Sequence, residues 1–168
     1  MPHSLIIGMT ESGKTSLATE LCQNYRARGI KTIVLDPMYD QRWQADFLTT
    51  DKDRFLEIVQ NPETRSCALF IDESGEEIGQ YKREMFWLAT RGRHYGHNSH
   101  FITQKAKQLS PTVRDQCSYL FLFNSSIDDC KELANEFNRP ELRTANTLAK
   151  GEYFQCPRWG QIERLRVF

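Results

Sequence analysis

Long hydrophobic runs are missing from this sequence of 168 residues. No stretch approaches the roughly 20 apolar residues that span a bilayer. The first fifteen residues also lack the basic start and the long apolar core of a signal peptide. These absences predict a protein without a membrane span, working in a cytoplasm.

Net charge and paired cysteines are missing as well. The sequence has 22 Lys and Arg against 22 Asp and Glu, which excludes a protein coated with positive charge for nucleic acid but not a basic strip on one face. The five cysteines show no C-x-x-C spacing, which argues against a zinc site and a disulfide framework. We expect them to be small core residues in a reducing compartment.

Repeats, linkers and low-complexity tracts are absent too, so the sequence predicts one domain over residues 1–168. Short apolar runs alternate with segments of helical periodicity, which predicts an α/β fold with a mainly parallel central sheet and helices on both faces. Two further runs beyond residue 150 predict a C-terminal antiparallel hairpin at a sheet edge. The predicted strands are 3–8, 31–35, 67–72, 99–103, 119–123, 152–156 and 161–167, and the predicted helices are 13–28, 51–60, 76–90 and 127–137.

One motif indicates phosphate binding. Residues 8–15, GMTESGKT, match G-x-x-x-x-G-K-[ST] in full and lie between an apolar strand and an amphipathic helix. The glycines let the backbone curl around an anion, and the amides and the positive end of the helix then face phosphate oxygens. We expect Lys14 to reach the β- and γ-phosphates of ATP and the Thr15 hydroxyl to bind Mg²⁺. The predicted nucleotide-binding residues are Gly8, Thr10, Glu11, Ser12, Gly13, Lys14, Thr15 and Ser16.

Two carboxylates follow the third apolar run. Asp72 is predicted to bind Mg²⁺ together with Thr15, and Glu73 to polarise the attacking water as the catalytic base. The alternatives are a helix N-cap for Asp72 and a surface carboxylate for Glu73. The adjacent pair favours the three-layer P-loop NTPases (RecA/ASCE-like) that hydrolyse ATP and move something, with core strand order 5-1-4-3-2. In that order Gln104, after the fourth strand, faces the γ-phosphate as a catalytic sensor, unless it is simply a solvated glutamine.

Several segments together resemble the FtsK–HerA superfamily of DNA-pumping ATPases, and most closely the genome-packaging ATPases of tailless viruses with an internal membrane. These segments are GMTESGKTS, VLDP, LFIDES and ATRGRHYGHNSHFITQ, within residues 3–125. The resemblance implies a homo-oligomeric ring, with a hexamer favoured, that hydrolyses ATP between neighbouring subunits. It also implies double-stranded DNA as the cargo and a capsid portal or vertex protein as a partner.

The same resemblance implies an arginine finger, supplied by one subunit to the active site of the next. Arg91 and Arg93 lie at the family's position before the fourth strand, and Arg114 is an outside candidate. DNA contacts are predicted at Lys105 and Lys107 and in the segment 91–95, with ordinary surface charge as the alternative.

Histidines and tryptophans complete the prediction. His94, His97 and His100 run past two glycines into a strand, so we expect no shared metal ion. The tryptophans are expected to pack or to meet another subunit, with base stacking by Trp43 as a minor alternative.

Three other functions stay open from the sequence. A phage-assembly or secretion ATPase would share the phosphate loop but usually carries a membrane span. A small-molecule or nucleotide kinase would need an acceptor pocket and lid arginines. A non-motor switch would bind ATP and load a partner.

Overall fold

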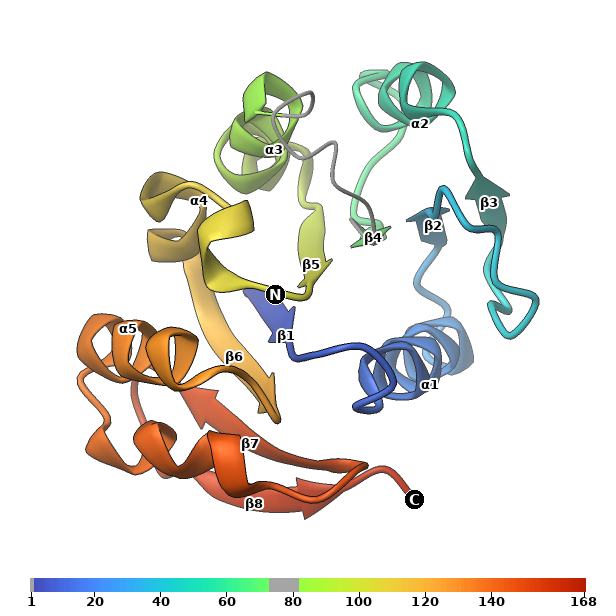
Figure 1. The fold of residues 1–168 in the computed structure, drawn as a ribbon. Coiled ribbons are helices and arrows are strands. Elements are labelled where there is room, and N and C mark those ends of the chain that lie inside the picture. Colours follow the sequence, from blue (N-terminus) through green and yellow to red (C-terminus); the bar gives the residue numbers. More distant parts are fainter. Residues whose placement is uncertain (1, 73–81) are drawn as a thin grey trace.

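An eight-stranded sheet organises the chain, for which the computed structural model describes residues 2–72 and 82–168 (Figure 1). The strand order is β3-β2-β4-β5-β1-β6-β7-β8. Neighbours from β3 to β6 pair in parallel, whereas β7 is antiparallel to β6 and β8 is antiparallel to β7. The strands are β1 (His3–Ile7), β2 (Thr32–Leu35), β3 (Phe47–Thr49), β4 (Ala68–Asp72), β5 (Asn98–Thr103), β6 (Cys117–Phe123), β7 (Glu152–Pro157) and β8 (Glu163–Arg166).

The predicted order of the five core strands is confirmed, since it corresponds to β6-β1-β5-β4-β2. The predicted hairpin is also confirmed, and it extends the sheet beyond β6. The full order differs from the prediction by β3, which adds an edge strand outside β2. With three half-buried residues, β3 is too short to show an alternating pattern in the sequence.

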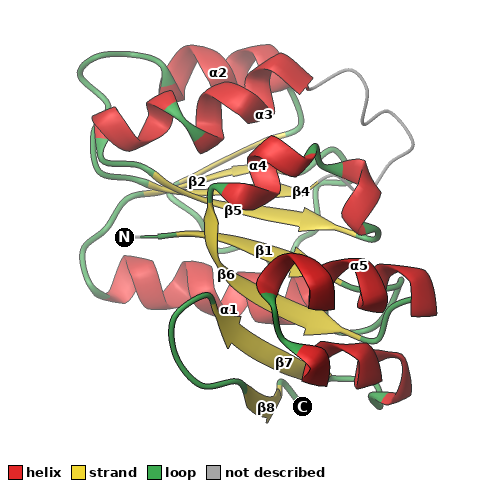
Figure 2. Ribbon diagram, turned by 90° about the vertical axis from the view of Figure 1, so that its left-hand side faces the viewer, coloured by secondary structure: helices red, strands yellow, loops and turns green. Residues whose placement is uncertain are grey.

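Helices cover both faces of the sheet, as predicted (Figures 1 and 2). The core on one face contains buried side chains of α1, and the core on the other contains those of α2, α3, α4 and α5. The α-helices are α1 (Lys14–Ala27), α2 (Lys52–Val59), α3 (Lys82–Ala89), α4 (Pro111–Asp115) and α5 (Ile127–Phe137), and the 3₁₀ segments are η2 (Arg91–Tyr95), η3 (Ala106–Gln108) and η4 (Pro140–Thr147).

Predicted helix positions hold for α1, α2 and α5. The predicted helix 76–90 is confirmed for its second half as α3, and its residues 76–81 lie outside the described residues. The short α4 and the 3₁₀ segments were not predicted, because α4 has only five residues and 3₁₀ segments do not follow the 3.6-residue period of an α-helix. Among the described residues, no helix is both long enough and apolar enough to cross a bilayer.

The cysteines, three of the four histidines (His3, His97 and His100) and Trp43 are buried. All five cysteines are free and buried, as predicted. The His97 ring bonds to the Cys67 amide and the Val59 carbonyl, and His100 bonds to Ser4. Trp43 is buried and donates its indole N–H to Asp36, so the base-stacking alternative for Trp43 is wrong.

Candidate nucleotide-binding site

The phosphate loop connects β1 to α1 at the edge of the sheet where the parallel strands end. Gly13 is the N-cap of α1, with φ 117° and no side-chain cap bond, and no acidic residue lies in the first helical turn. The first amides of a helix have no partner inside the helix. Here they stay available to an anion, which the positive end of the helix dipole also attracts.

Glycine is required at both glycine positions of the motif because the loop approaches its neighbours closely. A Cβ added to Gly8 would lie 2.5 Å from the Phe123 Cβ, which is closer than any such contact can be. A Cβ on Gly13 would lie 3.0 Å from Val167 Cγ2, and its positive φ would strain any other residue. Between them Glu11 takes φ 64°, which costs a non-glycine residue about 1 kcal/mol.

Lys14 lies folded over its own loop. Its ammonium donates to the carbonyl oxygens of Gly8 and Met9 at 2.6 and 2.9 Å. Burial lowers the pKa of Lys14 to about 8, although the neighbouring Asp72 acts in the opposite direction. An anion that enters the loop stabilises the charged form of such a desolvated ammonium and raises its pKa.

Asp72 ends β4 on the same edge of the sheet and is 8% exposed. Burial raises its pKa to about 7, Asp36 and Asp40 add to the rise, and Lys14 opposes it. Asp36 is itself fixed, because it accepts hydrogen bonds from the amides of Met38 and Asp40 and from Trp43. A buried carboxylate beside further carboxylates is poorly compensated, so an added cation would stabilise it.

Asp72 should make the stability of the nucleotide-free protein depend on pH. Between about pH 4 and pH 7 the folded protein keeps a proton on Asp72 that the unfolded chain releases, so this contribution to stability is lost as pH rises through about 7. We expect Asp72→Asn to raise the free energy of unfolding at pH 8 by about 1–2 kcal/mol, with little change at pH 4, where both states keep the proton. Urea denaturation at both pH values measures this, with exposed Asp53→Asn as the control. An equal effect of Asp72→Asn at both pH values would contradict the assignment.

Gln104 follows β5 and reaches the phosphate loop. Its side-chain amide donates to the Thr10 hydroxyl at 2.9 Å. The turn behind it is held by Gln108, whose side-chain oxygen accepts from the amides of Gln104 and Lys105 at 3.2 Å each and from the Thr103 hydroxyl. The structure therefore brings Gln104 to the loop, as its position after the fourth core strand suggested.

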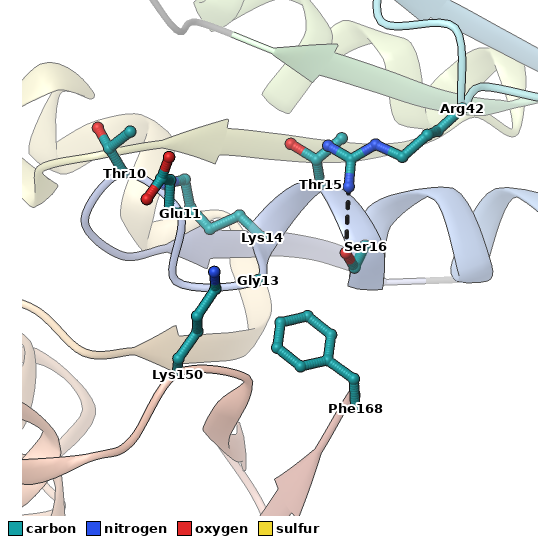
Figure 3. A pocket seen from close by; sticks show the side chains of 9 residues that line it. All are labelled: Thr10, Glu11, Gly13, Lys14, Thr15, Ser16, Arg42, Lys150 and Phe168. Atoms are coloured by element: carbon teal, nitrogen blue, oxygen red, sulfur yellow. Dashed lines mark hydrogen bonds between the residues drawn. The ribbon is translucent and has the colours of Figure 1, made fainter.

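A pocket of about 420 Å³ opens beside the loop (Figure 3). Three lining residues were not predicted from the sequence. Arg42 pairs with Asp40 at 2.8 Å and donates to the Ser16 hydroxyl at 3.3 Å. Lys150 and Phe168 face the loop from the hairpin side. The lining residues are Thr10, Glu11, Gly13, Lys14, Thr15, Ser16, Arg42, Lys150 and Phe168.

Two of the predicted site residues lie elsewhere in the subunit. Arg91 and Arg93 are exposed in η2, which precedes β5, whereas the loop lies beyond the other end of that strand. Six strand residues separate the two by about 20 Å. Neither arginine reaches the phosphate loop of its own subunit. The Arg93 guanidinium donates to the Gln116 carbonyl.

Arg114 is wrong as a finger candidate. Its side chain is 3% exposed and pairs with Glu132 at 3.1 Å and Glu136 at 2.6 Å. It therefore cannot extend from this chain into the active site of another. Glu73, the predicted catalytic base, lies outside the described residues.

A phosphate loop between the first strand and helix of a sheet with this order defines the fold of the P-loop ATPases. Solved structures confirm this fold. The genome packaging NTPase B204 from Sulfolobus turreted icosahedral virus 2, in complex with AMPPCP, is similar with TM-score 0.79 at 16% identity, over 98% of this chain and 96% of that chain.

Other ATPases share the fold. The cytoplasmic domain of the type VII secretion ATPase EccC from Thermomonospora curvata has TM-score 0.73 at 14% identity, over 98% of this chain and 25% of that chain. VirB4 of Thermoanaerobacter pseudethanolicus has TM-score 0.74 at 10% identity, over 99% of this chain and 89% of that chain. No protein-family model and no curated protein matches the sequence. The predicted resemblance is thus confirmed at the level of the fold.

Proposed function

We propose that this protein hydrolyses ATP and uses the energy to move double-stranded DNA, as the motor that packages a viral genome into a preformed capsid. One observation carries the ATPase part: an open helix N-terminus, the Lys14 ammonium and the buried Asp72 carboxylate meet at one loop. This is the set of groups that a triphosphate with a divalent cation requires.

Each group has a role in that reaction. The loop amides and Lys14 hold the β- and γ-phosphates, and Gln104 orients the attacking water beside the γ-phosphate. Glu73 follows Asp72 in the chain and accepts a proton from that water. Thr15 and Asp72 fit Mg²⁺, because both offer oxygen ligands and the Asp72 carboxylate is short of positive charge. The metal ion, when bound, neutralises charge on the phosphate oxygens.

The DNA part rests on the fold and on the turn after β5. The similar protein B204 is a genome packaging NTPase, and the two chains cover each other almost completely. Lys105 and Lys107 are exposed in the turn that starts at Gln104. The Gln108 side-chain oxygen accepts from the amides of both Gln104 and Lys105. A change in the hydrogen bonds of Gln104 on ATP hydrolysis therefore shifts the turn that carries the two lysines.

A homo-oligomeric ring, most simply a hexamer, accounts for the position of the arginines. Arg91 and Arg93 are too far from their own phosphate loop, so either can act only on the nucleotide of a neighbouring subunit. We assign a capsid portal or vertex protein as the docking partner and the host cytoplasm as the place of action.

Duplex DNA should stimulate ATP hydrolysis severalfold at low salt, and the stimulation should fall steeply as salt rises, because phosphate contacts release counterions. Steady-state phosphate release with and without duplex DNA measures it. Lys105→Gln with Lys107→Gln should lose the stimulation, while the exposed Lys131→Gln on α5 keeps it. Transfer of labelled phosphate to a nucleoside or nucleotide would contradict the motor and identify a kinase.

Export of a polypeptide is the second candidate function. The fold of the secretion ATPase EccC covers 98% of this chain, although this chain covers 25% of that protein. An ATP hydrolysis rate that duplex DNA leaves unchanged but an unfolded polypeptide increases would favour export over packaging.

A further inference from the structure

The C-terminal hairpin is fixed against the phosphate loop. The Gly151 amide donates to the Ser12 carbonyl at 2.9 Å, and the Val167 amide donates to the Gly151 carbonyl at 2.9 Å. Val167 also packs on Gly13, where an added Cβ would lie 3.0 Å from its side chain. The residues that precede β7 and follow β8 therefore contact the phosphate loop, while the two strands form the edge of the sheet.

Phe168 extends from this hairpin into the pocket. One side of its ring lies against Gly151, since a Cβ on Gly151 would be 2.8 Å from the Phe168 Cε2 atom. The side chain is still 59% exposed. Figure 3 shows the ring below Gly13 and Ser16, on the opposite side of the pocket from Arg42. The ring is therefore held along its Cδ2–Cε2 edge, and enough of it is exposed for a ligand to stack on it.

We propose that Phe168 is the stacking platform for the base of the bound nucleotide. The proposal rests on the proposed function, because it takes the triphosphate to lie in the loop of Gly8–Thr15. Sugar and base then continue past Ser16, the residue after that loop, into the pocket. Among the residues described around this pocket, Phe168 carries the only aromatic ring.

The side chains that line the pocket also limit how well this site can distinguish one nucleotide base from another. Stacking is available to any base, because every base has a π-face. The other lining side chains beyond the phosphate loop are Ser16, whose hydroxyl accepts from Arg42, and the cations Arg42 and Lys150. The two cations match phosphate oxygens better than a base edge. Hydrogen bonds to the base edge therefore do not select the nucleotide, and we expect ATP and GTP to bind with affinities within about threefold of each other.

Titration of two ligands tests the platform. We expect Phe168→Ala to weaken binding of a nonhydrolysable ATP analogue by about tenfold and to leave the affinity for inorganic tripolyphosphate within about twofold. Phe168→Tyr keeps the ring and should bind both ligands as the parent protein does. Trp159→Ala is the matched control, since Trp159 is a 92% exposed aromatic in the turn of the same hairpin and outside the pocket.

The outcomes separate the two proposals. Equal losses for the analogue and for tripolyphosphate in Phe168→Ala, or no loss for either, would overturn the platform and leave the phosphate site standing. Failure of Phe168→Tyr to restore analogue binding would also overturn it. A parent protein that binds neither ligand would overturn the proposed function and the platform together.

Discussion

Lys14→Ala should reduce ATP hydrolysis by about 1,000-fold or more and weaken nucleotide binding severely. Lys14 is the single cation within the loop of Gly8–Thr15, and its side chain folds back so that the ammonium donates to the Gly8 and Met9 carbonyls. Burial lowers its pKa to about 8, so binding of a triphosphate both needs this charge and restores it. No other lining cation lies inside the loop, because Arg42 and Lys150 reach the pocket from other segments.

Phosphate release and titration with a fluorescent ATP analogue measure the two effects. Lys131→Ala, on the exposed side of α5, is the control for loss of a lysine in general. Circular dichroism checks that the variant is folded, which we expect because Lys14 lies at the pocket and outside both cores. Hydrolysis by folded Lys14→Ala at the parental rate would place the reaction elsewhere in the protein.

Glu73→Gln should keep nucleotide binding and lower the hydrolysis rate by about 100-fold or more. Glu73 follows Asp72, and Asp72 closes β4 beside the loop. Glutamine has nearly the same size but cannot accept a proton from water, so the loss falls on the chemical step rather than on affinity. Single-turnover hydrolysis compared with equilibrium binding separates the two.

A carboxylate control makes the Glu73 result specific. Glu73→Asp keeps a base at a shorter reach and should retain more activity than Glu73→Gln. If Glu73→Gln turns over at the parental rate, another group takes the proton. Weaker binding in proportion to the lost rate would instead indicate that Glu73 contributes to the metal site.

The parts of the fold that the sequence predicted share strong local signals. The five core strands, β1, β2, β4, β5 and β6, are short apolar runs in the sequence. Strands that are covered on both faces leave little room for polar residues. The loop of Gly8–Thr15 was readable because its glycines are fixed by close approach to Phe123 and Val167. In contrast, β3 has three half-buried residues and no signal of its own.

The missed site residues have a different cause. Arg42, Lys150 and Phe168 lie far from the motif in sequence and reach the pocket only because β2, β7 and β8 are arranged around α1. Of these three residues, only Arg42 could have been found from the sequence. It lies in the loop after β2, and loops that follow parallel strands share the edge of the sheet where the phosphate loop lies. Arg114 was misjudged because its partners, Glu132 and Glu136, lie 18 and 22 residues further along the chain, in α5.

The central claim is that the loop of Gly8–Thr15 holds the triphosphate. A crystal structure with Mg²⁺ and a nonhydrolysable ATP analogue tests this most directly. We expect the Lys14 ammonium to leave the Gly8 and Met9 carbonyls and bind phosphate oxygens at about 3 Å, with the metal ion beside Thr15 and Asp72. A nucleotide bound elsewhere, with Lys14 still on those two carbonyls, would contradict the account.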